Sequence, residues 1–247
     1  MLPRVTTPGE HRFLVDGVIP VLKVHHEPRP EPAVVVLHGL GASTEVQLPE
    51  LSSLADAGLV AAAIDAPHHG RRRDAWLDEL EKLAGGAAHL RFLELLQEAI
   101  PEVSRVIDHL QREGHHPVGL LGISLGAFTA LGVARADARV ACTVSILGSP
   151  DWRPLTGEPD EAMVELMRAA PVFAPEATAR APLLLMNAGR DTVVPPDASR
   201  AFAHRLTGTH PVEYVEFPES DHLMRPGDWT ELWARALRFL RRHLASR

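Results

Sequence analysis

The sequence is poor in cysteine, in positive charge and in long apolar runs, and each shortage excludes a class of protein. Its single cysteine, Cys142, rules out an intramolecular disulfide. No apolar run approaches the roughly 18 residues needed to span a bilayer, and the N-terminal residues lack the apolar core of a signal peptide. The net charge of −7 argues against nucleic-acid binding, which needs concentrated positive charge. We therefore expect a cytoplasmic protein that binds neither membranes nor nucleic acid.

Clusters of basic residues and histidines are the local exceptions, and neither predicts a ligand site. The run Arg71-Arg72-Arg73 is followed at once by acidic residues, which is typical of a solvated loop and helix face. The pairs His25-His26, His68-His69 and His115-His116 lack cysteine or carboxylate partners at ligand spacing, and adjacent residues on a strand point to opposite sides. We expect no metal. No nucleotide, flavin or haem motif is present, so we also expect no cofactor.

The length and the order of apolar segments predict an α/β fold. A chain of 247 residues is long enough for one domain that buries roughly 70–75% of its unfolded surface. Two alternating segments surround Asp16-Gly17, a hairpin signal. Short apolar runs follow, as is typical of parallel strands covered on both faces. These strands are expected at residues 33–37, 59–64, 118–121, 140–147, 182–186 and 212–217.

Helical patterns separate these strands, at residues 87–112, 125–135, 198–206 and 229–243. Pro101 should kink or divide the first of these helices. Alternation of strands and helices predicts a doubly wound, mostly parallel sheet with antiparallel strands at its start. The proline-rich stretch from about 149 to 180, with one helical pattern at 160–169, is expected to be a small lid insertion in a single domain spanning residues 1–247.

A candidate nucleophile stands in Gly122-Ile123-Ser124-Leu125-Gly126, which matches G-x-S-x-G. An apolar strand precedes this motif and a helix pattern follows it, as a nucleophile elbow requires. A sharp turn brings the flanking backbones together, and glycine has no Cβ to clash. The motif predicts that Ser124 is held clear of the sheet at the positive end of a helix.

A serine alcohol needs a base, and that base needs an acid to fix its tautomer. His222 follows the last expected strand, and Asp191 follows the strand before it. The order Ser124, Asp191, His222 is the order that this strand–turn–helix fold uses. Asp221 is the rival acid, but a residue adjacent to His222 in sequence is poorly placed to reach its ring. Asp191 could instead be a turn residue.

An acyl-transfer site also needs two backbone N–H groups for the oxyanion. Leu125, directly after the nucleophile, should supply one of them. Leu40 should supply the other, because it follows a strand in His38-Gly39-Leu40-Gly41. We expect His38 and Asp65 to order the loops beneath the nucleophile.

Taken together, these motifs resemble α/β-hydrolases of the dienelactone-hydrolase and prolyl-oligopeptidase-like esterase group. The resemblance covers most of the chain, and it implies hydrolysis of carboxylic esters through an acyl-enzyme. Dienelactone hydrolases proper use a cysteine nucleophile, whereas this chain has serine, and the chain has no room for an N-terminal propeller. The matching segments are residues 38–41, 65–70, 122–126, 189–195 and 221–222.

The function expected from these motifs is that of a serine carboxylesterase acting on small, short-acyl esters. A thioesterase or a small serine aminopeptidase would use the same triad, and a non-catalytic ligand-binding hydrolase fold is a further alternative. Trp152, Met163 and Met167 of the insertion could face an acyl pocket or simply pack downward as a lid helix, and His68 could line the entrance. The partner is expected to be a small-molecule ester, and the chain a monomer or homodimer.

Overall fold

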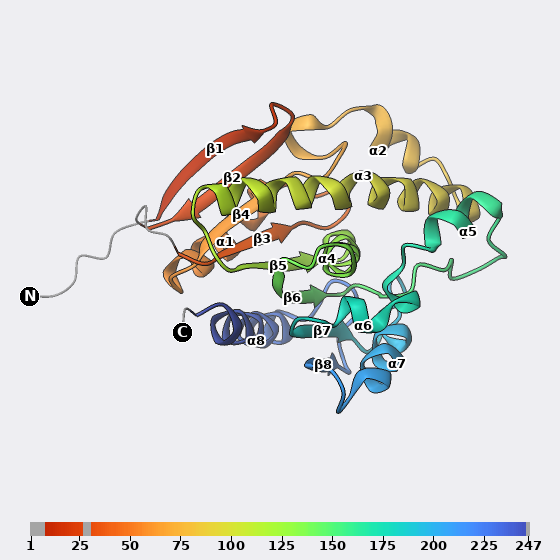
Figure 1. The fold of residues 1–247 in the computed structure, drawn as a ribbon. Helices are drawn as coiled ribbons and strands as arrows, with labels where there is room; N and C mark the ends of the chain where they lie inside the picture. Colours follow the sequence, from red (N-terminus) through yellow and green to blue (C-terminus); the bar gives the residue numbers. More distant parts are fainter. Residues whose placement is uncertain (1–7, 27–30, 246–247) are drawn as a thin grey trace, which may run out of the picture.

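The computed structural model describes residues 8–26 and 31–245, and its centre is one eight-stranded sheet (Figure 1). The strand order is β1-β2-β4-β3-β5-β6-β7-β8. β1 pairs antiparallel with β2, and β2 with β4, while the remaining pairs are parallel. The strands are β1 (Gly9–Val15), β2 (Ile19–His25), β3 (Ala33–Leu37), β4 (Val60–Ile64), β5 (Val118–Ile123), β6 (Val140–Ile146), β7 (Leu183–Ala188) and β8 (Val212–Phe217). The predicted fold class, mostly parallel with an antiparallel start, is confirmed.

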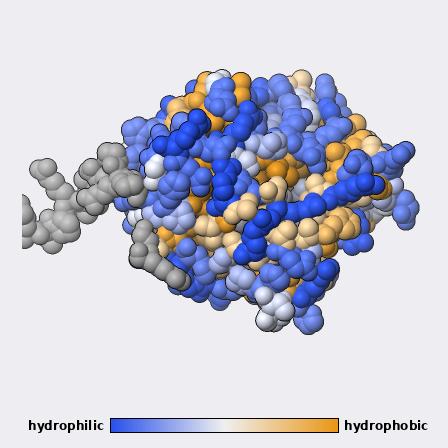
Figure 2. Space-filling view, in the orientation of Figure 1, coloured by the Kyte–Doolittle hydropathy of each residue, from blue (hydrophilic) through white to orange (hydrophobic). Residues whose placement is uncertain are grey.

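Helices cover both faces of the sheet. The α-helices are α1 (Leu48–Asp56), α2 (Ala75–Leu80), α3 (Gly85–Arg112), α4 (Leu125–Ala136), α5 (Glu161–Met167), α6 (Pro175–Thr178), α7 (Asp197–Leu206) and α8 (Pro226–Leu244). Short 3₁₀ turns are η1 (Thr44–Gln47), η2 (Gly70–Arg72) and η3 (Pro171–Phe173). One apolar core lies between the sheet and α1 and α8, and a second lies between the sheet and α3 and α4. The surface seen in Figure 2 is mainly hydrophilic, with apolar residues in patches and recesses between the polar ones.

The observed helices correct two expectations from the sequence. α3 runs without interruption from Gly85 to Arg112, so Pro101 does not divide it. Proline removes the hydrogen bond to the carbonyl of Gln97, four residues earlier, but Gln97 is exposed and water can take the freed oxygen. The sequence patterns did not predict α1 and α2, which are short and follow the loops after β3 and β4.

The segment between β6 and β7 carries α5, η3 and α6 and lies at the carboxyl ends of the strands, where the arrows of β3, β5 and β6 point in Figure 1. Trp152, Met163 and Met167 of this segment join an apolar cluster with residues of α2 and α3. The segment is therefore anchored by a small core of its own. The single-domain organisation, with this segment as an insertion, stays a prediction.

Candidate active site

Ser124 stands at a strained turn between β5 and α4. Its φ of 52° and ψ of −116° are rare for a residue with a side chain. A Cβ on Gly122 would lie 2.1 Å from the carbonyl oxygen of Gly126, and a Cβ on Gly126 would lie 2.1 Å from that of Leu37. Both glycines of the motif are therefore required by close backbone approach, and together they allow the turn that presents Ser124.

The structure brings His222 and Asp191 to Ser124. The strands β5, β7 and β8 are parallel, so the loops after them meet at one edge of the sheet. The hydroxyl oxygen of Ser124 lies 3.0 Å from His222 Nε2, and His222 Nδ1 lies 2.7 Å from Asp191 Oδ2. The side chain of Asp191 is fully buried and that of His222 is 21% exposed. A hydroxyl, an imidazole and a carboxylate thus form one continuous hydrogen-bonded chain.

Backbone groups fix the orientation of the Asp191 carboxylate. Its Oδ1 accepts hydrogen bonds from the N–H groups of Val193, at 2.9 Å, and Val194, at 2.8 Å. Its Oδ2 is left to accept the Nδ1–H of His222, which leaves Nε2 free to accept a proton from Ser124. Asp221, in contrast, is exposed and accepts the N–H of Leu223 at 3.0 Å.

The two residues expected to supply oxyanion donors border the same cavity as Ser124. Leu125 is the first residue of α4, where N–H groups have no acceptor within the helix. Leu40 follows Gly39, and a Cβ on Gly39 would lie 3.6 Å from Ser124 Cβ. The loop after β3 therefore runs directly beside the serine, and α4 begins at the residue after it.

Buried polar side chains hold this loop. His38 Nδ1 lies 2.8 Å from the carbonyl of Gly39, and its Nε2 accepts the N–H of Ala66 at 3.0 Å. Burial lowers the pKa of His38, which favours the neutral imidazole that this pairing requires. The buried carboxylate of Asp65 accepts the N–H groups of Thr44, at 2.9 Å, and Arg71, at 3.0 Å. Both residues therefore tie the loops after β3 and β4 together, as the sequence suggested.

Arg72 corrects the expectation that the basic run is merely a solvated face. Its guanidinium donates to the carbonyls of Asp65, at 2.7 Å, and Ala66, at 3.1 Å, and pairs with Glu102 of α3. Only 20% of the Arg72 side chain is exposed, whereas the neighbouring arginines are exposed. The middle arginine of the run is thus part of the framework under the site.

A cavity of about 830 Å³ opens in front of Ser124 and His222. Residues of α3, α4, the segment after β6, the loop after β7 and the start of α7 form its walls. They include His89, Phe92, Phe128, Ser149, Asp151, Trp152, Arg153, Pro154, Leu155, Val193, Val194, Pro195, Asp197 and Ala198. Most of these residues escaped sequence analysis, because only the folded chain brings the helices and loops that carry them around one cavity.

Of the four residues suggested for substrate binding, Trp152 lines this cavity. Met163 and Met167 are buried in the apolar cluster beside it. His68 lies between carboxylates, with Nδ1 2.8 Å from Asp74 and Nε2 3.2 Å from Glu98, and its ring stacks on Trp76. Among the described residues that form the cavity walls, Met163, Met167 and His68 are absent.

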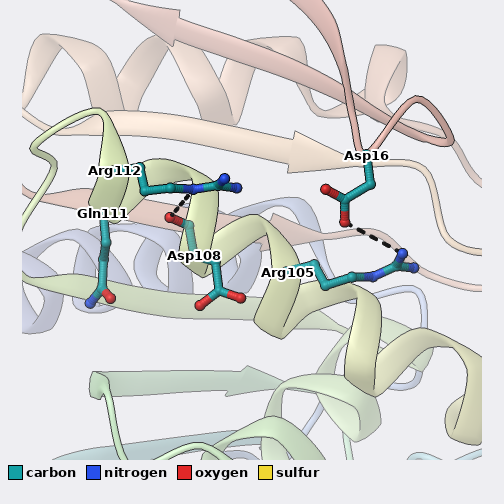
Figure 3. Close-up of a pocket in the computed structure, with 5 residues that line it drawn as sticks. All are labelled: Asp16, Arg105, Asp108, Gln111 and Arg112. Atoms are coloured by element: carbon teal, nitrogen blue, oxygen red, sulfur yellow. Dashed lines mark hydrogen bonds and ion pairs between the residues drawn. The ribbon is translucent and has the colours of Figure 1, made fainter.

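Two further features lie apart from the chain of Ser124, His222 and Asp191. A depression of about 470 Å³ is lined by residues of α3 and the β1–β2 turn, where Asp16 and Arg105 face each other at 3.5 Å (Figure 3). It shares no lining residue with the Ser124 cavity. Cys142 is buried, and burial raises the pKa of its thiol to about 12. Within residues 8–26 and 31–245, no three His, Cys, Asp or Glu side chains are grouped to hold a metal ion, and no helix is both long and apolar enough to cross a membrane.

Comparison with known proteins agrees with this architecture. The model of the alpha/beta hydrolase family matches residues 34–244. Esterase YjfP of Escherichia coli (strain K12) is 30% identical over 225 residues, which cover 81% of this chain and 85% of that protein. YitV of Bacillus subtilis (strain 168) is 28% identical over 220 residues, covering 81% and 82%. The crystal structure of TT1662 from Thermus thermophilus, 26% identical, superimposes with a TM-score of 0.78 over 97% of this chain and 99% of that one. The chain belongs to the alpha/beta hydrolase family.

Proposed function

We propose that the protein is a serine carboxylesterase that hydrolyses small, short-acyl carboxylic esters through an acyl-enzyme. The observation that carries this proposal is the hydrogen-bonded chain from Ser124 through His222 to Asp191, set at the mouth of a cavity. A relative named as an esterase, YjfP, supports the same class of reaction. The segment after β6 adds only the short helices α5 and α6 over this edge of the sheet, which favours short acyl groups over long lipid chains.

The geometry supports a two-step mechanism. His222 Nε2 takes the hydroxyl proton as Ser124 Oγ bonds to the ester carbonyl carbon. The resulting oxyanion is stabilised by the backbone N–H groups of Leu125 and Leu40. The carbon–oxygen bond to the alcohol then breaks, and the alcohol leaves with the proton held by His222. Water repeats the sequence on the acyl-enzyme and releases the acid.

Asp191 supports the positive charge that His222 carries between these proton transfers. Its burial and its two backbone donors keep the carboxylate oriented toward Nδ1. The strained backbone of Ser124 is stabilised by the surrounding sheet, since its N–H donates to the carbonyl of Ile146 at 2.8 Å. The nucleophile is therefore in position before substrate binds.

Replacement of the nucleophile tests the proposal. Ser124→Ala should lower kcat for 4-nitrophenyl acetate by roughly 10⁴–10⁶-fold while leaving the fold intact. A fluorophosphonate probe should label the wild-type protein with one equivalent at Ser124 and leave the variant unlabelled. Near-normal turnover by the variant would reject Ser124 as nucleophile. Folded wild-type protein that resists the probe would favour a non-catalytic binding protein.

A further inference from the structure

Three aromatic side chains gather on one side of the cavity. Phe92 comes from α3, Phe128 from α4 and Trp152 from the segment after β6. The rings of Phe92 and Phe128 meet edge to face, with centroids 5.1 Å apart and planes at 87°. His89 Nε2 donates a hydrogen bond to the carbonyl of Trp152 at 2.8 Å, which anchors that segment to α3. The aromatic wall is thus built from three separate parts of the chain.

Neighbouring protein groups do not fully cover these phenylalanine rings. Phe92 and Phe128 pack against a cluster whose members Leu93, Leu96 and Trp152 are buried, yet both remain only partly buried themselves. Both also line the cavity. The uncovered part of each ring therefore faces space that a ligand can fill, and aromatic rings favour offset or edge contacts with another ring.

The part of the cavity next to His222 belongs to the leaving group. Val193, Val194 and Pro195 line the cavity and follow Asp191, whose carboxylate holds His222. Because the departing alcohol takes its proton from His222, it must leave on that side. The acyl group then extends into the rest of the cavity, which Phe128 lines one helical turn along α4 from Ser124.

The carboxylates that line this cavity are paired with arginines, which favours a neutral acyl group. Asp197 accepts a hydrogen bond from Arg200 at 2.7 Å. Both carboxylate oxygens of Asp151 accept hydrogen bonds from the guanidinium of Arg153. Burial raises the pKa of Asp151, but the hydrogen bonds and charge of Arg153 outweigh burial and lower it overall. The pair therefore cancels its own charge beside the aromatic wall.

We propose that the acyl pocket selects short acyl groups that carry a neutral aromatic ring, such as phenylacetyl. This inference rests on the proposed esterase function and names its substrate class. Ring-on-ring contact and the added apolar burial should raise kcat/KM by about 10-fold or more over an unbranched acyl group of similar reach. Phe92 and Phe128 are the residues that determine this preference.

The experiment compares 4-nitrophenyl acetate, butyrate and phenylacetate, with each kcat/KM divided by the rate constant for hydrolysis by hydroxide. The shared leaving group keeps the other side of the cavity constant. Phe128→Leu and Phe92→Leu remove a ring but keep an apolar side chain, so the fold is retained. Phe173→Leu is the matched control, because Phe173 is 61% exposed and does not line the cavity.

The wild-type enzyme and the Phe173→Leu control should prefer phenylacetate over butyrate by about 10-fold or more. Phe128→Leu should reduce that preference at least about threefold, and labelling of Ser124 by the fluorophosphonate probe verifies that the site of this variant is assembled. Equal corrected kcat/KM values for phenylacetate and butyrate in the wild-type enzyme would overturn the aromatic preference. So would an equal fall in kcat/KM for both esters in the Phe92 and Phe128 variants. Neither result would contradict the proposed esterase function. Absence of turnover with all three esters would reject the proposed function, and the preference with it.

Discussion

Replacing Asp191 with asparagine should disable the proposed base without moving it. Asp191 Oδ1 accepts two backbone N–H groups, from Val193 and Val194, so an asparagine must keep its carbonyl oxygen there. The NH₂ group of the asparagine would then take the place of Oδ2, which lies 2.7 Å from His222 Nδ1. Because NH₂ donates, Nδ1 must accept, and the imidazole proton moves to Nε2. In that tautomer His222 has no lone pair for the proton of Ser124.

The expected loss in kcat is about 10⁴-fold, as for the same change in a serine-protease triad. This corresponds to about 5.5 kcal/mol of transition-state stabilisation. Since the backbone hydrogen bonds and the burial are kept, the melting temperature should change little. The assay is steady-state hydrolysis of 4-nitrophenyl acetate, with circular dichroism to verify that each variant is folded.

Asp221→Asn is the matched control, because it makes the same chemical change beside His222. Asp221 is exposed, and its carboxylate oxygen Oδ1 accepts a hydrogen bond from the backbone N–H of Leu223. Asparagine serves equally well as such an acceptor, so kcat should stay within about twofold of wild type. Equal losses in the two variants, or a larger loss for Asp221→Asn, would refute the assignment of Asp191 as the acid.

Three further predictions concern the turn and the framework around the site. Burial lowers the pKa of His69 in the folded protein, so the unfolded chain binds a proton at this residue more readily. The melting temperature should therefore fall as the pH drops from about 6.5 toward 5, and a melting temperature that stays level or rises in thermal scans across that range would contradict this. Gly126→Ala would place a Cβ 2.1 Å from the carbonyl oxygen of Leu37. Urea unfolding should show that the free energy of unfolding falls by about 1–3 kcal/mol, and kcat should fall about 10²-fold or more. An unchanged kcat would show that the turn at Ser124 tolerates a side chain. Arg72→Ala removes charged donors from the backbone carbonyls of Asp65 and Ala66, and it should lower the free energy of unfolding by about 2 kcal/mol in the same assay. Arg73 is exposed, so Arg73→Ala should change that free energy by no more than about 0.5 kcal/mol. Equal effects of the two substitutions would show that the hydrogen bonds of Arg72 contribute nothing to stability.

The parts of the site that sequence could predict are those that follow directly from strand ends. Ser124, Asp191 and His222 each come just after an apolar strand, and the carboxyl ends of parallel strands share one edge. Local motif and strand order were therefore sufficient to bring them together. The fold class followed from the same alternation of strands and helices.

The cavity walls could not be predicted in this way. Phe92 sits in the apolar stripe of α3 beside Leu93 and Leu96, and its spacing is the same as that of a core residue. Whether such a residue faces the core or a cavity depends on how the segment after β6 packs on α3, which is a long-range contact. The same limit applies to Arg72, whose backbone acceptors are brought near it only by the folded loop after β4.

Two different kinds of constraint therefore act on the two halves of this site. The nucleophile turn is fixed by backbone contacts: added Cβ atoms at Gly122 and Gly126 would lie 2.1 Å from carbonyl oxygens, so a side chain at either position forces the backbone to shift. The proposed acyl wall is formed by side chains, and Phe92 and Phe128 are partly uncovered rings that other apolar residues can replace. Substitutions in the wall can consequently change which ester fits while leaving the chain from Ser124 to Asp191 in place. On this argument, substrate preference within this architecture varies through α3, α4 and the segment after β6, and the chemistry stays with the loops after β3, β5, β7 and β8.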